Sequence, residues 1–399
     1  MRILLLVVYY LPSTMSSAKL FYDLAVELQR LGHEPIVVAP DENILSDTEI
    51  TCENGIKVLR VRTGKIKTAS KLIRGVNEAR LSEIIWKRGR RFFKENSCDL
   101  IIYYSPTIFF GTFVKRLKRL FSCPSYLILR DIFPQWALDA GVLRRGIIYS
   151  YFKFKERQNY DAADIIGVQS PANLRYFGEH GLDKQYQLEV LYNWATLQEG
   201  NLKPGAHRER LGLQGKVVFF YGGNIGVAQD VDNIIRLAKN LRNEKTAYFL
   251  LLGDGSEVPR LKSAIASNGL TNIAMHDAVG QQEYLSMLSE FDVGLISLDR
   301  GLRTQNFPGK LLGYMYHAKP ILASINPGND LKEILERQQA GLVCMNGEDD
   351  LFATHARRLV REENCRRQLG KNSRTLLENT FSVSKAAEQI LSHFNQALA

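Results

Sequence analysis

The side chains best suited to chemistry gather in one short stretch, where a lysine stands at the start of a predicted helix. A polar loop with Arg303 and Asn306 leads to Pro308, which a first helical turn tolerates because its missing N–H needs no partner there. The free N–H groups of a helix start attract anions, and Lys310 adds a positive charge in the same turn. We therefore expect an anion site here, with a solvated lysine as the ordinary alternative.

Two glycine turns follow predicted strands in the same half of the chain. Gly222–Gly226 comes directly after Lys216–Tyr221, and Gly253–Gly255 comes directly after Tyr248–Leu252. Glycine lets the backbone approach a phosphate closely, although it also relieves tight turns. The spacing is not the GxGxxG of dinucleotide sites. The candidate ligand-binding residues of these turns are Gly223, Asn224, Gly253, Asp254 and Gly255.

A second candidate site lies in the other half of the chain. Arg130 and Asp131 directly follow the predicted strand Ser125–Leu129, which places them at a strand's carboxyl end. A carboxylate there could act as a general base or orient a hydroxyl group. Two structural alternatives stay open: Asp131 could cap a turn before Pro134, and Arg130 could simply pair with it.

Neither the acids nor the histidines predict a bound metal. Asp230 and Asp232 form a DxD pattern, but acids are expected at a helix start as cap and dipole partners. The seven histidines show no metal-ligand spacing.

Strands alternate with helices along the whole chain, which predicts parallel sheets covered by helices. A polar segment from about Trp194 to His207 has the composition of a linker. We therefore predict an α/β protein of two doubly wound, Rossmann-like domains facing a cleft. The predicted domains are residues 1–195 and 205–383, followed by a C-terminal helix at 384–399 whose packing partner is open.

The formal net charge of +10 is concentrated in residues 51–119, with 17 Lys and Arg against 5 Asp and Glu. This basic window favours an anionic partner, and a membrane surface ahead of nucleic acid because no nucleic-acid-binding motif accompanies it. Val76–Lys94 could form an amphipathic helix there, although a solvated helix face is the ordinary explanation. The five scattered cysteines indicate reduced thiols in a cytoplasmic chain, and no apolar run is long enough to span a bilayer.

The chain resembles the retaining glycosyltransferase family 4, which has the GT-B fold. The resemblance rests on YGGNIGVAQD, LLGDGSE and especially NFPGKLLGYMYHAKPILASINPGND. The last motif, with DIFPQW, is similar to the subgroup that acts in O-antigen and capsule assembly, including N-acetylfucosamine transferases. The resemblance implies a bacterial, hexosyltransferase-type enzyme. It would move a sugar from a UDP-sugar to a lipid-diphosphate-linked saccharide, with retention and without a metal or other cofactor.

The resemblance also implies roles for single residues. Lys310 would neutralise the leaving diphosphate, and Asp131 falls near the position of a catalytic histidine or aspartate. On the donor side, the implied contacts are Gly223, Asn224, Gly253, Asp254, Gly255 and Val279. On the acceptor side or in the N-terminal loop, they are Ser16, Ser17, Lys19 and Arg130.

The sequence departs from the family at its paired glutamates, whose positions hold Gln305 and Gly313. The arginine–lysine phosphate pair is also missing, because Asn224 and Gln229 stand there. Arg303 with Lys310 could restore the positive charge. We predict an enzyme peripheral to the cytoplasmic face of the plasma membrane, without a nucleic acid partner. The alternatives are a UDP-sugar epimerase of the same fold and a non-catalytic nucleotide-sugar or nucleic-acid binding module.

Overall fold

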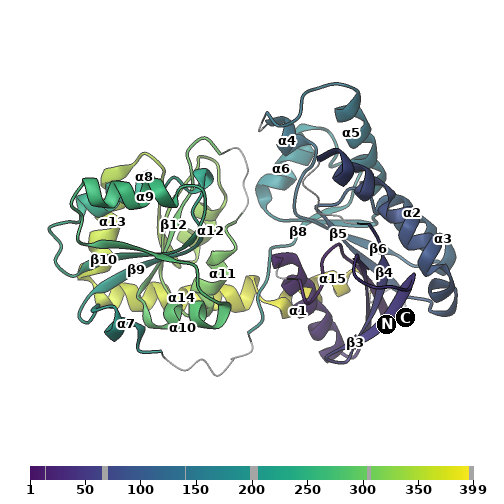
Figure 1. Ribbon diagram of the computed structural model, residues 1–399, viewed down its shortest axis with the longest axis horizontal. Coiled ribbons are helices and arrows are strands. Elements are labelled where there is room, and N and C mark those ends of the chain that lie inside the picture. Colours follow the sequence, from purple (N-terminus) through teal and green to yellow (C-terminus); the bar gives the residue numbers. More distant parts are fainter. Residues whose placement is uncertain (14, 65–70, 140, 198–204, 303–306, 395–399) are drawn as a thin grey trace. The chain divides into compact units, whose positions relative to one another are not determined.

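A computed structural model describes the chain except residues 14, 65–70, 140, 198–204, 303–306 and 395–399, and it leaves the side chains of 71–76 undescribed. The protein divides into two compact units (Figure 1). Unit 1 comprises Met1–Asn193 together with the chain from Val383 onward, and unit 2 comprises Trp194–Ser382. Each unit is built around its own sheet.

The sheet of unit 1 has eight strands in the order β3-β4-β2-β1-β5-β6-β7-β8. Its neighbouring strands run parallel, except that β3 and β4 are antiparallel. Apolar runs such as Leu100–Ser105 are buried along their whole length, as expected of strands covered on both faces. The strands are β1 (Arg2–Leu6), β2 (Glu34–Asp41), β3 (Thr48–Glu53), β4 (Ile56–Arg62), β5 (Leu100–Ser105), β6 (Ser125–Leu129), β7 (Ile165–Val168) and β8 (Leu188–Val190).

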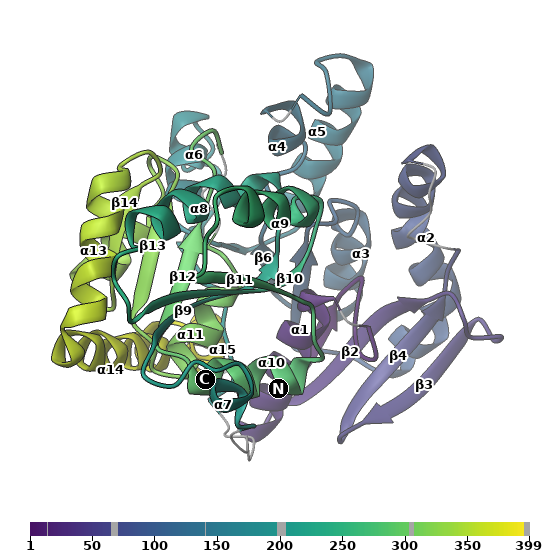
Figure 2. The same cartoon turned by 60° about the vertical axis from the view of Figure 1, so that its left-hand side comes forward.

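Helices cover both faces of this sheet. One layer consists of α2 (Lys71–Glu95), α3 (Gly111–Phe121), α5 (Ile147–Tyr160) and α6 (Pro171–Glu179) (Figure 2). Each of these helices contributes buried side chains to the same hydrophobic core as the strands. The other layer contains α1 (Ser16–Arg30), which packs on β2 and β4, and α15 (Val383–Ser392), which packs on α1. The short helix α4 (Gln135–Asp139) follows β6.

The sheet of unit 2 is entirely parallel among its described strands, in the order β11-β10-β9-β12-β13-β14. The order reverses between β9 and β12, which makes this pair the topological switch point of a doubly wound sheet. The strands are β9 (Val217–Asn224), β10 (Ala247–Asp254), β11 (Ile273–Asp277), β12 (Val293–Ser297), β13 (Ile321–Ile325) and β14 (Gly341–Met345).

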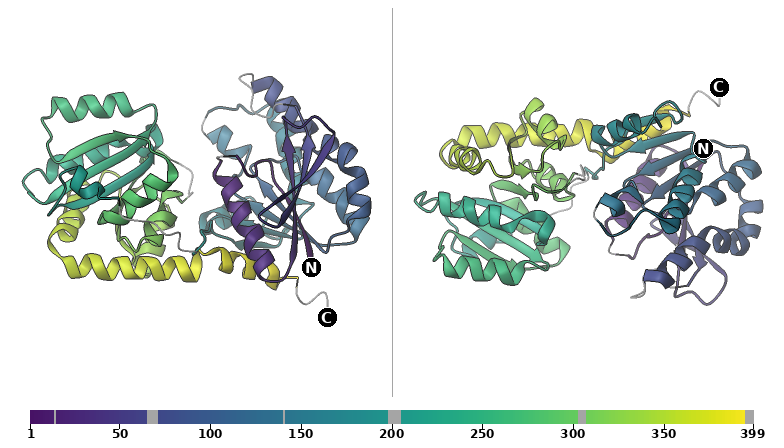
Figure 3. Two further views of the ribbon diagram at one scale, coloured as in Figure 1. Left: turned by 60° about the horizontal axis from the view of Figure 1, so that its bottom comes forward. Right: turned by 90° about the horizontal axis from the view of Figure 1, so that it is seen from above.

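Two helical layers also enclose the sheet of unit 2 (Figure 3). One layer holds α8 (Val231–Asn240), α9 (Val258–Ser267) and α13 (Asp349–Arg361). The other holds α7 (His207–Arg210), α10 (Gln281–Glu290), α11 (Lys310–Tyr316) and α14 (Glu363–Thr380). The remaining elements are η1 (Val227–Gln229) and α12 (Leu331–Arg337), which packs on β14. The predicted α/β class with two doubly wound sheets is confirmed.

Several details differ from the sequence-based expectation. The hairpin strand β3 is an additional element, and Met15 holds the N-cap position of α1, directly before Ser16 and Ser17. The ends of the expected linker belong to unit 2, since Trp194 and His207 are buried and Glu290 accepts the backbone N–H groups of Gly205 and His207. Within the described part of the chain, each helix is too short or too polar to cross a membrane.

Candidate functional site

The carboxyl ends of β9 and β10 lie side by side in unit 2. Their parallel register pairs Gly223 with Gly253 and Asn224 with Asp254, so the two predicted glycine turns meet at one edge of the sheet. Gly223, Asn224 and Asp254 are exposed there. Because β9 also borders the switch point, this edge is where a doubly wound sheet binds ligands.

Lys310 begins α11 and approaches the end of β9. Its Nζ lies 3.2 Å from the centroid of the Tyr221 ring, a cation–π contact, and a Cβ placed on Gly223 would lie 3.8 Å from Lys310 Cε. The residue is half-buried as a whole, but loss of solvent around the ammonium lowers its pKa well below the usual lysine value. Burial is the cause of this shift, with no compensating carboxylate among the described residues. The structure thus brings Lys310 to Tyr221 and Gly223.

Hydrogen bonds hold the turn after β9 from within. The Tyr221 hydroxyl donates to the Asn224 carbonyl oxygen at 2.8 Å. The Asn224 side-chain amide donates to Gln229 Oε1 at 2.8 Å, and the Gly226 N–H donates to the same oxygen at 3.1 Å. Gln229, which stands where the resemblance implied a phosphate-binding cation, therefore stabilises the turn.

Tyr314 joins the two strands at the switch point and was not identified from the sequence. Its hydroxyl accepts the Gly222 N–H at 3.4 Å and donates to the Leu295 carbonyl oxygen at 3.1 Å. Tyr314 is fully buried in α11, one helical turn after Lys310. It therefore fixes the helix that carries the lysine. Its spacing of four residues from Lys310 was the available signal, because residues at i and i+4 share a helix face.

Gly253 and Gly255 have a packing role that is independent of any ligand. A Cβ on Gly253 would lie 1.8 Å from the Gly223 carbonyl oxygen, and one on Gly255 would lie 2.2 Å from the Ile225 carbonyl oxygen. Only glycine allows the two turns to approach so closely. Asp254, between them, accepts the Gly255 N–H through Oδ1 at 2.7 Å. Gly223 differs, since an added Cβ there would meet only the end of Lys310.

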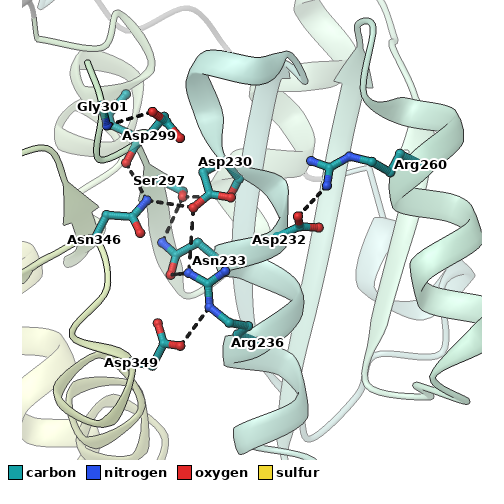
Figure 4. Close-up of polar contacts among 11 residues, drawn as sticks. Asp230, Asp232, Asn233, Arg236, Arg260, Ser297, Asp299, Gly301, Asn346 and Asp349 are labelled. Carbon is teal, nitrogen blue, oxygen red and sulfur yellow. Dashed lines mark hydrogen bonds and ion pairs between the residues drawn. The ribbon is translucent and has the colours of Figure 1, made fainter. Parts of the chain in front are cut away.

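The acids of the DxD pattern are engaged in contacts within unit 2 (Figure 4). Asp230 accepts a hydrogen bond from Asn346 at 2.9 Å and lies 3.7 Å from Arg236, while Asp232 pairs with Arg260. Asp230 occupies the N-cap position of α8, but its side chain makes no capping hydrogen bond. The two acids therefore stand at a helix start, as expected. Their partners are Asn346 after β14, Arg236 on α8 and Arg260 on α9, and Asp230 makes no side-chain bond to the N–H groups of the helix.

The same network ties α8 to the ends of β12 and β14. Asn233 donates to the Ser297 hydroxyl at 3.0 Å, and Arg236 bridges to Asp349 at 2.8 Å. Asn346 also donates to the Leu298 carbonyl oxygen at 2.8 Å. Among the described residues, no group of three or more His, Cys, Asp or Glu side chains is placed to hold a metal ion.

In unit 1, Arg130 and Asp131 directly follow β6, as expected. Arg130 is buried and donates to the carbonyl oxygens of Leu191 at 2.7 Å and Tyr192 at 3.3 Å. This burial lowers its pKa to about 10. Arg130 therefore fastens the segment after β8 to the end of β6. Asp131 is partly exposed at this strand end, and its negative charge favours the charged form of the Arg130 guanidinium.

The N-terminal loop residues lie at the start of α1. Ser16 is exposed and Ser17 is buried. Lys19 pairs with Asp23 at 2.5 Å, so its charge is already partly neutralised.

In unit 2, Val279 is partly exposed between β11 and α10, at the same sheet edge as the glycine turns. The predicted contacts Arg303 and Asn306, with Gln305, lie outside the described residues.

Comparison with known proteins gives this site a family context. Residues 205–376, most of unit 2, match the family model for glycosyl transferases group 1. This matched segment contains the switch point, both glycine turns and Lys310.

The similarity extends to whole proteins. The chain is 27% identical over 266 residues to WbjE of Pseudomonas aeruginosa, named as a probable glycosyltransferase, and the match covers 64% of each chain. It is 23% identical over 260 residues to WcaI of Escherichia coli, whose name links it to colanic acid biosynthesis, with 63% of each chain covered. These matches span just under two thirds of the relatives' lengths.

A solved structure shares the fold over nearly the full chain. HepE of Anabaena in complex with UDP superposes with a TM-score of 0.67 at 15% identity, covering 99% of this chain and 100% of HepE. The fold is GT-B, with two parallel-sheet α/β domains.

Proposed function

We propose that this protein is a glycosyltransferase of bacterial polysaccharide synthesis. It moves a sugar from a UDP-sugar, with N-acetylfucosamine or a related amino sugar as our candidate, to a lipid-diphosphate-linked saccharide of an O-antigen or capsule. The proposal is supported by the glycosyltransferase group 1 domain, by the likeness to WbjE and WcaI, and by a UDP complex of the same fold. The observation that carries it is the desolvated Lys310 ammonium beside Gly223 at the switch point.

Lys310 has the chemistry that the leaving group requires. When the anomeric C–O bond breaks, its electron pair stays on the UDP phosphate oxygen, and negative charge grows there. A cation fixed in poorly solvated surroundings stabilises that charge more strongly than a cation in water. We assign Lys310 to the diphosphate, with Gly223 and Asn224 offering an exposed backbone for close approach. We also assign Arg303 and Asn306 to the donor, on charge and position in the sequence alone.

The acceptor side belongs to unit 1 in this proposal. The acceptor hydroxyl oxygen forms the new bond to the anomeric carbon on the face that the diphosphate leaves, which retains the configuration. Asp131 orients this hydroxyl or takes up its proton. The protein needs no metal, since Lys310 and the helix start of α11 provide the positive charge.

We further propose a peripheral location on the cytoplasmic face of the plasma membrane, because a lipid-linked acceptor must be reached there. The basic window 51–119 would contribute attraction to anionic lipid. Four of its apolar side chains, Leu81, Ile85, Phe92 and Phe93, are buried in the core of unit 1. The window therefore offers charge more than apolar contact.

Calorimetric titration with UDP and GDP, each with and without EDTA, tests the donor class. We expect UDP to bind whether or not EDTA is present, and Lys310→Met to lose at least about tenfold in affinity. Lys262→Met is the matched control, because Lys262 lies on α9 and pairs with Asp277. Equal UDP affinity in Lys310→Met and the wild type would refute the assignment of Lys310.

Turnover separates the enzyme from its alternatives. A transferase releases UDP only when an acceptor is present, whereas an epimerase converts the UDP-sugar alone and a binding module converts nothing. Proton NMR of the first product shows whether the anomeric configuration is retained.

A further inference from the structure

Apolar side chains are exposed around the start of α5 in unit 1. Ile147 is 91% exposed, Ile148 61%, Phe154 56% and Tyr151 41%. We call this surface the tip face, and it consists of Trp136, Val142, Ile147, Ile148, Tyr151 and Phe154. Single exposed apolar residues are ordinary, but a cluster of them marks an interaction site.

Local contacts hold α4 and α5 together beneath the tip face. The Tyr149 hydroxyl donates to Gln135 Oε1 at 3.2 Å, and the ring centroids of Phe133 and Phe152 lie 5.0 Å apart. Phe152 also contacts Phe109, with 6.4 Å between centroids. The two helices stand together at one end of unit 1 (Figures 1 and 2).

Most of the tip face is the outer side of α5, whose inner side is already packed. Ile147, Tyr151 and Phe154 follow the i, i+4, i+7 spacing of a single helical stripe. On the other side, Phe152 packs as described and Tyr160 is buried in the core. The outer stripe is therefore not needed to complete the fold of unit 1.

The charge around the tip face is mostly positive. Residues 136–155 contain four cations and a single acid, the exposed Asp139. Arg144 and Arg145 are exposed. Lys155 lies over the rings of Tyr151 at 5.8 Å and Phe154 at 5.6 Å, while Lys153 pairs with Glu156. Apolar side chains flanked by cations are complementary to an anionic bilayer surface, which offers acyl chains beneath negative headgroups.

This charge pattern also disfavours a second copy of the chain as the occupant. A two-fold interface would place the same cations of both copies near one another. The basic helices α2 and α3 lie in the same layer as α5, since α2 packs on α3 and α3 packs on α5. They extend the positive charge on this side of unit 1.

We propose that the tip face inserts into the headgroup region of an anionic bilayer and is the apolar anchor of this protein. The purpose of such docking rests on the proposed lipid-linked acceptor, but the docking itself is measurable without donor or acceptor. The anchor thus lies at 136–154, outside the basic window that the sequence favoured.

Vesicle flotation with the full chain tests this anchor. Vesicles of phosphatidylglycerol and phosphatidylethanolamine are compared with neutral phosphatidylcholine vesicles. We expect the wild type to float with the anionic vesicles, and Ile147→Ser/Ile148→Ser/Phe154→Ser to bind at least about tenfold more weakly. The matched control is Leu45→Ser/Ile50→Ser, which removes apolar side chains that are 91% and 59% exposed elsewhere in unit 1. It should float like the wild type.

A second pair of measurements keeps the test independent of the triple variant. Arg144→Glu/Arg145→Glu should weaken flotation with anionic vesicles by about tenfold or more. The fluorescence of Trp136 should shift to shorter wavelength on binding, and the shift should be absent from a bound Trp136→Phe variant.

Several results would overturn the anchor. They are absence of wild-type flotation, equal flotation of the triple variant and the wild type, or equal losses in the triple variant and its control. A dimer by light scattering that becomes a monomer in the triple variant, without vesicle binding, would assign the tip face to a second copy. UDP affinity should be unchanged in the triple variant, so failure of the anchor and failure of the donor assignment are distinguishable.

Discussion

The Lys310 ammonium nitrogen lies 3.2 Å from the centroid of the Tyr221 ring, which makes the end of β9 the support for the first residue of α11. Tyr221→Phe keeps the ring and should retain UDP affinity within about threefold. Tyr221→Leu removes the ring face and should weaken UDP binding about tenfold or more, because the cation–π contact positions the ammonium. Phe249→Leu, which alters a buried ring of the neighbouring strand, should lower the melting temperature without this loss of affinity. Calorimetry and thermal melting decide between these outcomes.

UDP affinity should fall as pH rises, and the fall should begin at a lower pH than the ordinary pKa of lysine predicts. Burial lowers the pKa of Lys310 in the free protein, so the ammonium begins to lose its proton below the usual lysine range. Bound diphosphate favours the charged form, and binding above the lowered pKa must take up a proton. Titrations above pH 7 in buffers of different ionisation enthalpy should detect this uptake. Lys310→Arg should remove it, and proton uptake that persists in this variant would contradict the role of Lys310.

Lys310→Met should stabilise unit 2 while it weakens donor binding. A lysine whose pKa is lowered by folding destabilises the folded state while both states are protonated, and the penalty disappears as pH rises toward the unfolded pKa of about 10.4. The melting temperature of the variant should therefore exceed the wild-type value by about 2 °C or more at pH 7. The difference should shrink toward pH 10. If the variant melts below the wild type at every pH, the favourable contacts of the ammonium outweigh the cost of burying it.

Asp230→Asn/Asp232→Asn should leave UDP affinity unchanged with Mg²⁺ or with EDTA. Both carboxylates contact side chains of unit 2, namely Asn346 and Arg236 for Asp230, and Arg260 for Asp232. Asparagine also tolerates the positive φ of 38° at position 230. We expect a loss of about 1 kcal/mol in unfolding free energy, measured by urea titration. A Mg²⁺-dependent drop in UDP affinity would instead identify a metal site.

Asp131→Asn should lower turnover about a hundredfold or more while UDP affinity stays the same. The amide keeps the shape of the side chain but cannot take up the acceptor proton. Steady-state kinetics with a lipid-linked saccharide give the turnover, and calorimetry gives the UDP affinity. Arg130→Lys provides a neighbouring control that should chiefly reduce stability, because Arg130 holds the Leu191 and Tyr192 carbonyl groups. Wild-type turnover in Asp131→Asn would remove Asp131 from the proposed mechanism.

Local patterns were sufficient to predict the parallel sheets and to place the glycine turns at the carboxyl ends of two of their strands. Apolar strands, glycine turns and leucine-spaced helices are encoded within a few residues, and carboxyl ends of parallel strands must share an edge. The antiparallel strand β3 was missed, although Asn54-Gly55, with φ of 52° and 84°, is a typical hairpin signal. This dipeptide thus predicts the hairpin from local sequence alone.

Other features depend on contacts between distant segments. Tyr314 could not be assigned to the switch point before β9 and β12 were known to be neighbours. The sequence gives the charge of the basic window correctly, yet Leu81, Ile85, Phe92 and Phe93 of this window belong to the core. By contrast, Ile147, Ile148 and Phe154 of α5 face solvent. Sequence periodicity identifies an apolar stripe but does not tell which stripe another element covers.

Helix α15 belongs to unit 1, although more than 180 residues of unit 2 precede it. It packs on α1, buries Ala387 and Ile390, and its Gln389 side chain donates to the Val190 carbonyl oxygen at 2.9 Å. During synthesis from the N-terminus, unit 1 is therefore the first to leave the ribosome and the last to be completed. Until α15 arrives, the α1 surface that it covers stays exposed while all of unit 2 is synthesised.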